Sequence, residues 1–169
     1  SPLGRWSADM VRSAAGAQIG IYNPGGLRAD LVEGVLTKGA LYQVYPFANN
    51  VVRFELTGAQ LVGLLLKNAR ALGNGDHPVM QLSGVRVTWR MRAGAPELME
   101  IRVGDTALDP KQTYTASTNS FVADRWSYNL GFEPQDIVKL DVTVFGAAVD
   151  LAERGPITAP PNPRMVRID

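Results

Sequence analysis

The sequence predicts an α+β fold in which a mixed, largely antiparallel sheet packs against helices. Leucine recurs at helical spacing in residues 57–72, which predicts a helix. Apolar and polar residues alternate in other segments, which predicts strands at 51–56, 84–89, 98–103 and 112–118. Because helical and strand segments interleave irregularly and no internal repeat is present, the sequence favours this class over a regular strand–helix alternation.

The first predicted element is a helix over residues 6–15. Trp6 and Met10 lie close to one face of that helix, and Gly16 is a residue type that commonly follows a helix end. A short apolar strand is expected next, at residues 19–22. These residues predict a helix and a strand joined by a tight connection.

The middle of the chain is expected to hold a short helix, a strand and a longer helix. The short helix lies within residues 31–45 and is closed by Pro46, because the residue before a proline avoids helical angles. The strand at 51–56 turns one apolar face towards the core. Thr57 and Gln60 have the spacing of a capping box, which predicts the start of the longer helix.

The second half of the chain is expected to contain a meander, a loop and a helix. The three predicted strands between residues 84 and 118 are separated by Gly, Pro and Asp, so we expect them to pair antiparallel in sequence order. Residues 121–135 are predicted as a loop, 142–154 as an amphipathic helix, and 165–168 as a final strand.

Composition excludes several classes of protein. The 169 residues suit one domain over residues 1–169. A net charge of +1 with interspersed signs gives no basic surface for a nucleic acid polymer, and no apolar run is long enough for a transmembrane segment. Without cysteine the chain has no disulfide, thiol nucleophile or thiolate metal site.

The sequence offers no set of residues for catalysis or metal binding. Its single histidine, His77, lies among turn formers and is expected on a surface loop, which excludes a His-rich metal centre. The carboxylate pairs Asp105 and Asp109, and Glu97 and Glu100, are interpreted as solvated surface. We therefore expect no catalytic residue and no metal ligand in this chain.

The turn at residues 23–28 is the main candidate for ligand binding. It follows a short strand and reads NPGGLR. Gly25 and Gly26 let a ligand approach the backbone, and Asn23 adds a polar side chain. Arg28 offers a planar fork of donors that suits a phosphate or a carboxylate. The turn therefore predicts an anion-binding site.

Several short motifs of the chain, taken in order, are shared with one known family. They read NPGGLRAD, PFANN, LTGAQL, DPKQTY and GPI, at residues 23–30, 46–50, 56–61, 109–114 and 155–157. Together they resemble the C-terminal domain of the 5'-nucleotidase family, which includes UDP-sugar hydrolases and 2',3'-cyclic-nucleotide phosphodiesterases. The resemblance covers nearly the whole chain and implies the fold of that domain.

The resemblance implies a division of labour between two domains. In that family an N-terminal metallophosphoesterase domain carries two divalent metal ions and the chemistry, while the C-terminal domain holds the nucleotide and delivers it. We therefore expect this chain to bind a nucleotide or nucleoside for a metal-dependent hydrolase of nucleotide catabolism. By itself it is expected to be inactive, with the metals held by a partner domain outside it. The resemblance also implies a periplasmic, secreted or cell-surface protein.

The resemblance also implies roles for single residues. Arg28 resembles the arginine that contacts the substrate phosphate, and Asn23 the asparagine near the ribose and the scissile bond. Gly25 and Gly26 resemble the glycines beside the ligand. All four lie in the turn that the residues alone already single out.

Two phenylalanines resemble the aromatic residues that clamp the nucleotide base between their faces. They are Phe47, in the PFANN motif, and Phe121, after the last strand of the predicted meander. Stacking on an aromatic ring contributes roughly 1–3 kcal/mol per base and tolerates different bases. The pair therefore implies affinity for a base without strict base selection.

The chain departs from the family pattern after Phe121. The family continues with an Ala, a Gly-Gly-Asp-Gly loop and another aromatic, and the Asp binds ribose hydroxyls. Residues 121–129 here read FVADRWSYN, so counting from Phe121 puts the acidic position at Ser127. Asp124 or Asn129 could substitute for it. Asp124 and Ser127 are therefore the candidate sugar contacts, with altered nucleotide specificity as the consequence.

Other interpretations of these residues stay open. Phe47 could be a core aromatic, and Asn23 could serve only as a turn former. Arg28 could pair with Asp30 or Glu33 at the surface. For function, the alternatives are a non-catalytic nucleoside or small-ligand binding module on the same scaffold, or a relative of the thiosulfohydrolase type.

Overall fold

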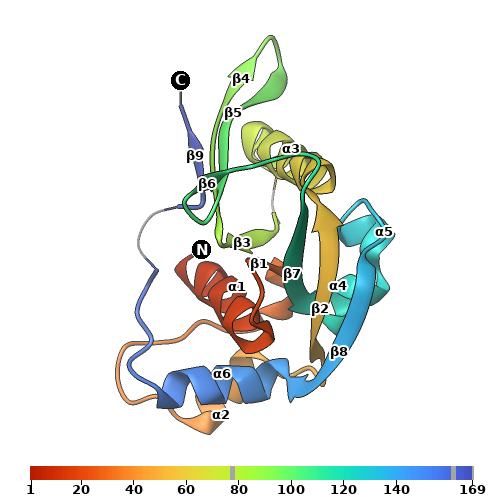
Figure 1. The fold of residues 1–169 in the computed structure, drawn as a ribbon. Coiled ribbons are helices and arrows are strands. Elements are labelled where there is room, and N and C mark those ends of the chain that lie inside the picture. Colours follow the sequence, from red (N-terminus) through yellow and green to blue (C-terminus); the bar gives the residue numbers. More distant parts are fainter. Residues whose placement is uncertain (77–78, 161–162, 169) are drawn as a thin grey trace.

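The chain folds into two sheets packed with helices in the computed structural model, which describes residues 1–76, 79–160 and 163–168 (Figure 1). His77, predicted as a surface loop residue, lies outside the described residues. The helices are α1 (Pro2–Ala15), α2 (Lys38–Val44), α3 (Gly58–Asn74), α4 (Ser120–Asp124), α5 (Trp126–Asn129) and α6 (Val144–Glu153), with a 3-10 turn η1 (Pro24–Gly26).

The strands are divided between two sheets. The first has the order β3-β1-β7-β2-β8 and contains β1 (Ile19–Tyr22), β2 (Asn50–Thr57), β3 (Gln81–Ser83), β7 (Thr113–Asn119) and β8 (Gln135–Thr143). The second has the order β6-β5-β4-β9 and contains β4 (Val85–Arg92), β5 (Ala95–Val103), β6 (Thr106–Ala107) and β9 (Met165–Arg167). In the described residues only β1–β7 and β4–β9 pair in parallel. The predicted α+β class with mixed, largely antiparallel pairing is confirmed.

The caps predicted at the helix ends are present. Thr57 Oγ1 accepts from Gln60 N at 3.2 Å, and Gln60 Oε1 accepts from Thr57 N at 2.7 Å, which completes the capping box of α3. α1 ends at Gly16 in the left-handed conformation, as expected. It begins at Pro2 rather than at residue 6, because the Ser1 hydroxyl caps it.

The predicted three-stranded meander is wrong in its last strand. β4 and β5 form an antiparallel hairpin, whereas β7 lies between β1 and β2 in the other sheet. Ala116, Ser117 and Thr118 of β7 are all 0% exposed, so these small side chains suit a central strand that is covered on both faces. Alternation of residue types does not show which sheet a strand joins.

Gly84 carries the chain from the first sheet to the second. It separates Ser83, the last residue of β3, from Val85, the first of β4, and has a φ of 73°. A Cβ atom at this position would lie 2.0 Å from the carbonyl oxygen of Gln18. Only glycine fits both the angle and the space.

The segment from residue 120 to 153 differs from the prediction in two ways. The predicted loop contains α4 and α5, and Asn119 caps α4 by accepting from Val122 N at 3.0 Å. The predicted helix at 142–154 begins only at Val144, because β8 occupies the residues before it. β8 is a largely exposed edge strand, yet its residues 138–143 read VKLDVT, the apolar–polar alternation of a strand, which the prediction leaves unassigned up to residue 141.

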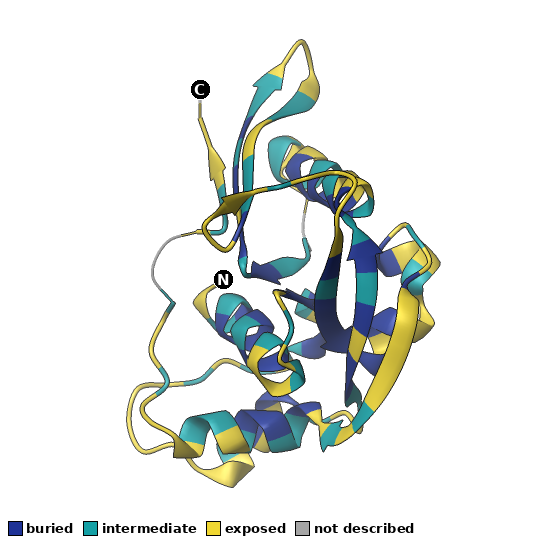
Figure 2. Cartoon of the chain, viewed as in Figure 1, coloured by how far each residue is buried: buried dark blue, intermediate teal, exposed yellow. Residues whose placement is uncertain are grey.

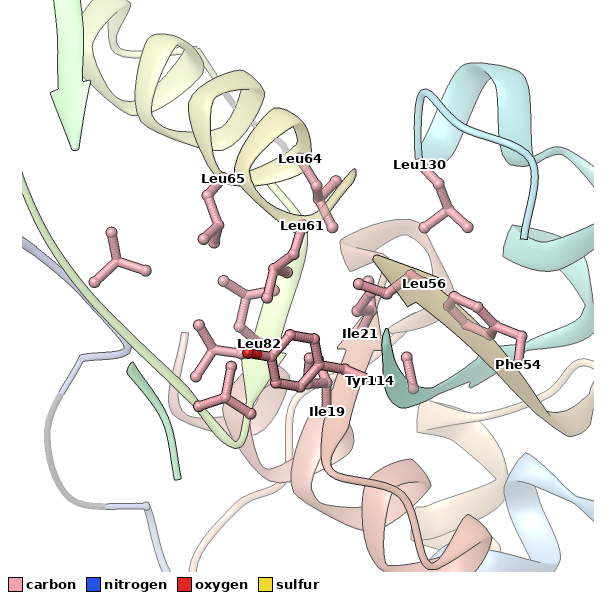
Figure 3. Close-up of a cluster of buried hydrophobic side chains, with 14 of the residues drawn as sticks. Ile19, Ile21, Phe54, Leu56, Leu61, Leu64, Leu65, Leu82, Tyr114 and Leu130 are labelled. Carbon is pink, nitrogen blue, oxygen red and sulfur yellow. The ribbon is translucent and has the colours of Figure 1, made fainter. Parts of the chain in front are cut away.

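The elements are held together by buried residues (Figure 2), whose hydrophobic side chains form two cores. In the first, Leu61, Leu64 and Leu65 of α3 pack towards β1, β2 and β7, as Figure 3 shows. In the second, α1, α2 and α6 pack together around Met10 and Tyr45. None of the helices in the described residues is sufficiently long and apolar to cross a membrane.

Candidate functional site

Three separate segments reach one edge of the first sheet because of its strand directions. β1 and β7 are parallel, so η1, which follows β1, and α4, which follows β7, leave the same edge. β2 runs antiparallel to β7, so the residues that precede β2 also lie at that edge. The topology thus brings together the NPGGLR turn, the PFANN motif and the start of α4.

A cavity of about 790 Å³ opens at this edge. Six of the predicted ligand-binding residues line it: Asn23, Gly25, Gly26, Arg28, Phe47 and Phe121. Other parts of its wall come from α3, from residues 79–80 and from α5. Its volume falls in the range of small-molecule sites, which is about 300–1,000 Å³.

Asn23 fixes the turn to the neighbouring strand. It is 9% exposed, and its Oδ1 accepts from the side-chain amide of Asn119 at 2.8 Å. Its side chain makes no capping hydrogen bond to η1, so a role as a turn former alone does not describe it. Because Asn119 also caps α4, the hydrogen bond between Asn23 and Asn119 links the NPGGLR turn to the helix that carries Phe121.

The two glycines of the turn have different surroundings. A Cβ on the buried Gly26 would lie 2.8 Å from the hydroxyl oxygen of Tyr22, whereas a Cβ on the exposed Gly25 would meet only Asn23 Nδ2, at 3.5 Å. Among the described residues neither glycine belongs to those with positive φ, so special backbone angles are not their role. Gly26 is needed for its close approach to Tyr22, and Gly25 presents bare backbone to the cavity.

Arg28 is an exposed cation at the cavity. Its guanidinium carbon lies 5.9 Å from the ring centroid of Phe47, and its backbone N–H donates to Val44 O at 3.0 Å. In the part of the chain that the structure describes, no carboxylate forms a salt bridge with Arg28, so the pairing with Asp30 or Glu33 considered from the sequence is absent. The guanidinium therefore keeps its donors for a ligand.

Neither predicted aromatic belongs to the core. Phe47 is 45% exposed and Phe121 is 39% exposed, so both rings present a face to the cavity or to solvent. The guanidinium of Arg125 lies 4.4 Å from the ring centroid of Phe121. Exposed rings that line an open, mainly apolar cavity suit a flat heterocycle better than they suit a core.

The structure does not bring Asp124 and Ser127 to the cavity wall in the described residues. Both are exposed, and α5 instead contributes Tyr128 and Asn129. Residues 120–129 form two short helices, so a position found by counting along an extended loop does not lie where the count would place it. Asp124 and Ser127 are therefore not part of the described lining, whereas Asn129, the other residue considered for the sugar contact, is.

Two polar residues of α3 that the sequence did not single out also line the cavity. Lys67 Nζ donates to Tyr128 O at 2.5 Å and to Asn129 O at 3.3 Å, and lies 5.7 Å from the Tyr128 ring centroid. Asn68 is buried and exchanges two hydrogen bonds with the backbone of Met80, of 2.9 and 3.2 Å. Together they tie α5 and residues 79–80 to α3.

A signal for Asn68 was present in the sequence. It follows Leu61 by seven residues and Leu64 by four, so it lies on the buried face of α3. A polar residue on such a face needs hydrogen-bond partners. Lys67 gave no comparable signal, because its partners depend on the path of α5.

The described residues offer no site for a metal ion. No three side chains of the types His, Cys, Asp and Glu gather within them in a way that could hold one. The described lining carries two cations, Arg28 and Lys67, and no Asp or Glu. The cavity is therefore suited to binding an anion through side-chain and backbone donors.

Comparisons with known proteins show which family the chain is similar to. Residues 1–128 match the family described as 5'-nucleotidase, C-terminal domain. Over 123 residues the chain is 32% identical to Endonuclease YhcR of Bacillus subtilis, and this alignment covers 73% of the chain and 10% of that protein. It is also 32% identical over 130 residues to the Trifunctional nucleotide phosphoesterase protein YfkN of the same organism, covering 71% and 9%.

A solved structure shows the same fold. The 5'-nucleotidase precursor from Thermus thermophilus superposes with a TM-score of 0.82 at 26% identity, covering 100% of this chain and 36% of that one. The chain thus spans about a tenth of the two Bacillus relatives and about a third of this structure.

Proposed function

The chain belongs to the family of 5'-nucleotidase C-terminal domains, and we propose that its cavity is the nucleotide-binding site of a two-domain, metal-dependent phosphohydrolase. One observation carries the proposal: six residues from the turn after β1, the segment before β2 and the start of α4 line a single cavity. A site assembled from such distant segments is better explained by ligand binding than by local turn geometry.

In this proposal Arg28 holds the phosphate. A guanidinium offers paired donors to phosphate oxygens, and charge-assisted hydrogen bonds contribute about 1.5–3 kcal/mol. The phosphate can come close to the backbone of Gly25 because no side chain intervenes. Asn23 lies beside Gly25, and its side-chain oxygen Oδ1 already accepts a hydrogen bond from Asn119. The phosphate end of the ligand thus faces the turn.

Phe47 and Phe121 take the base in the same proposal. Both rings line the cavity. Phe47 lies in the segment before β2, and Phe121 lies in α4, directly after β7. Base stacking of roughly 1–3 kcal/mol per ring would set affinity without selecting one base. The guanidinium of Arg125, 4.4 Å from the ring centroid of Phe121, adds positive charge beside that ring.

The hydrolytic chemistry is assigned to another domain. The described residues fit no metal ion, so we propose that two divalent ions are held by a metallophosphoesterase domain that receives the nucleotide from this one. This chain alone is then a binder without turnover. The proposal also places the protein in the periplasm, in the medium or at the cell surface, on the ground of the family alone.

A second candidate is a binding module that holds a nucleoside or another small ligand without any hydrolysis. One observation favours it: residues 121–129 depart from the family pattern, and neither Asp124 nor Ser127 is part of the described lining. A thiosulfohydrolase-type function is less well supported, because a small sulfur substrate does not need two half-exposed phenyl rings.

Titration calorimetry of the 169-residue chain with AMP, adenosine and UDP-glucose tests the site. We expect AMP to bind, and Arg28→Ala to weaken AMP binding while leaving adenosine binding nearly unchanged. Binding of none of the three ligands would contradict the proposal. In the complete protein, an unaltered kcat/KM for AMP hydrolysis in Arg28→Ala would reject the role of Arg28, whereas AMP binding without any hydrolysis would favour the binding module.

A further inference from the structure

The positive charge of the cavity comes from two places, and only one of them is used by the proposed function. Arg28 follows η1, whereas Lys67 belongs to α3. The described lining holds no Asp or Glu to balance either charge. A nucleoside monophosphate with its phosphate at Arg28 would leave Lys67 without an anionic partner.

The ammonium of Lys67 is positioned but not neutralised. Two backbone carbonyls, Tyr128 O and Asn129 O, accept from it at 2.5 and 3.3 Å. An ammonium has three donors, and carbonyl oxygens carry no net charge, so one N–H and the full positive charge remain. In the described residues no carboxylate forms a salt bridge with Lys67. The side chain is therefore a fixed cation at the cavity wall.

Each cation of the cavity stands beside an aromatic ring. Arg28 lies 5.9 Å from the ring centroid of Phe47, and Lys67 lies 5.7 Å from that of Tyr128. Both rings line the cavity, and Tyr128 is 80% exposed. Each pair offers a charged donor next to an apolar face, which suits an anionic group attached to a ring-bearing ligand.

We propose that the cavity selects a nucleotide that carries two separate anionic groups, the first bound by Arg28 and the second by Lys67. The inference rests on the proposed function, since it takes the same cavity and deepens its substrate class. The chemical class is a nucleoside bisphosphate, with one phosphate on the 5' position and a second on another sugar hydroxyl. Lys67 is then a specificity-determining residue that the sequence pattern did not indicate.

The test compares the affinities of AMP, adenosine 3',5'-bisphosphate and adenosine 2',5'-bisphosphate for the 169-residue chain. We expect at least one bisphosphate to bind about tenfold more tightly than AMP, which corresponds to one charge-assisted hydrogen bond. The preference is expected to shrink in high salt, since exposed charges are screened. Equal affinities of AMP and both bisphosphates would overturn the inference.

Three variants separate a role in charge from a role in folding. Lys67→Met keeps the apolar stem and removes the charge, so it should abolish the bisphosphate preference by weakening the bisphosphate more than it weakens AMP. Lys67→Arg keeps the charge and should retain the preference. Arg70→Met is the matched control, because Arg70 is exposed on the same helix and is not part of the described lining.

The remaining outcomes are also decisive. If Lys67→Met weakens AMP and bisphosphate by the same factor, Lys67 only holds α5 in place and the inference is wrong. If AMP binds and Arg28→Ala weakens it, but no bisphosphate binds more tightly, the proposed function stands and only the inference fails. If neither AMP nor a bisphosphate binds, the proposed function fails and the inference falls with it.

Discussion

The side-chain amide of Asn119, at the end of β7, donates a 2.8 Å hydrogen bond to Oδ1 of Asn23, at the start of the NPGGLR turn. Both side chains are buried, and the Oδ1 atom of Asn119 also caps α4 through Val122 N. One asparagine thus joins two parallel strand ends and begins the helix that carries Phe121. The geometry of the cavity edge depends on this pair.

A double-mutant cycle measures that dependence. Asn119→Ser keeps a capping oxygen but cannot reach Asn23, so we expect an unfolding free energy lower by about 1–3 kcal/mol, the cost of a buried unsatisfied partner. Asn23→Ala should cost a similar amount, and the double variant less than the sum. Urea denaturation gives all four values. Simple additivity would show that the two side chains do not cooperate.

Removal of the guanidinium should affect phosphate-bearing ligands selectively. For Arg28→Ala we expect AMP affinity to fall at least about tenfold, in line with the loss of a charge-assisted hydrogen bond, and adenosine affinity to change less than about twofold. Calorimetry measures both. Arg70→Ala, an exposed change on α3 outside the described lining, is the control. Equal losses for the two ligands would remove Arg28 from the phosphate end of the site.

Truncation of either lining phenylalanine should weaken AMP and adenosine to the same extent, because both ligands carry the same base. We expect each of Phe47→Ala and Phe121→Ala to cost about 1–3 kcal/mol of binding free energy. Tyr42→Ala is the control, since Tyr42 is 57% exposed and lies outside the described lining. A variant that binds both ligands with native affinity would show that its ring does not contact the base.

The neighbouring glycines give a matched pair for stability. Gly26→Ala would place a Cβ 2.8 Å from the Tyr22 hydroxyl oxygen, whereas Gly25→Ala meets only ordinary contact. We expect Gly26→Ala to lower the unfolding free energy by about 1–3 kcal/mol through overpacking, and Gly25→Ala to change it by less than about 0.5 kcal/mol. Thermal and urea unfolding report the difference. Similar stabilities of the two variants would show that Tyr22 moves aside without cost.

Two buried tyrosines predict a loss of stability in alkali. Burial raises the pKa of Tyr22 above its ordinary value, with a smaller effect of Tyr45, and burial likewise raises the pKa of Tyr45 despite its hydrogen bond with Ser7. Above about pH 10 the unfolded state loses these two protons while the folded state keeps them. Stability should therefore fall by about 1.4 kcal/mol per pH unit for each tyrosine.

Tyr22→Phe isolates one of the two contributions. Its unfolding free energy should fall about half as steeply with pH above pH 10 as that of the native chain, as measured by urea denaturation at several pH values. An unchanged slope would mean that Tyr22 ionises as readily in the folded state as in the unfolded one.

Much of the site could be predicted from the sequence because its parts are local motifs. The NPGGLR turn, the PFANN motif and Phe121 each lie at the end of a recognisable element, and strand direction alone then brings them together. The capping box of α3 is equally local. Motifs of this kind need only a few neighbouring residues to define their geometry.

The remainder depends on contacts between distant segments. The alternation in β7 marks a strand, but its place between β1 and β2 follows from small side chains that fill a buried layer. Lys67 gains its role only because α5 lies beside α3. Counting along an extended loop puts the acidic position at Ser127, but residues 120–129 form two short helices, and neither Ser127 nor Asp124 is part of the described lining.

The convergence of loops and helix ends at one edge of the first sheet has an evolutionary consequence. Cavity-lining positions such as Arg28, Lys67 and Tyr128 are all exposed, while the leucines of α3 that hold the fold belong to the buried hydrophobic core. Selection can therefore retune what the domain holds by exchanging a few rim residues. The architecture that supports them need not change, so descendants with one scaffold can diverge towards different metabolites.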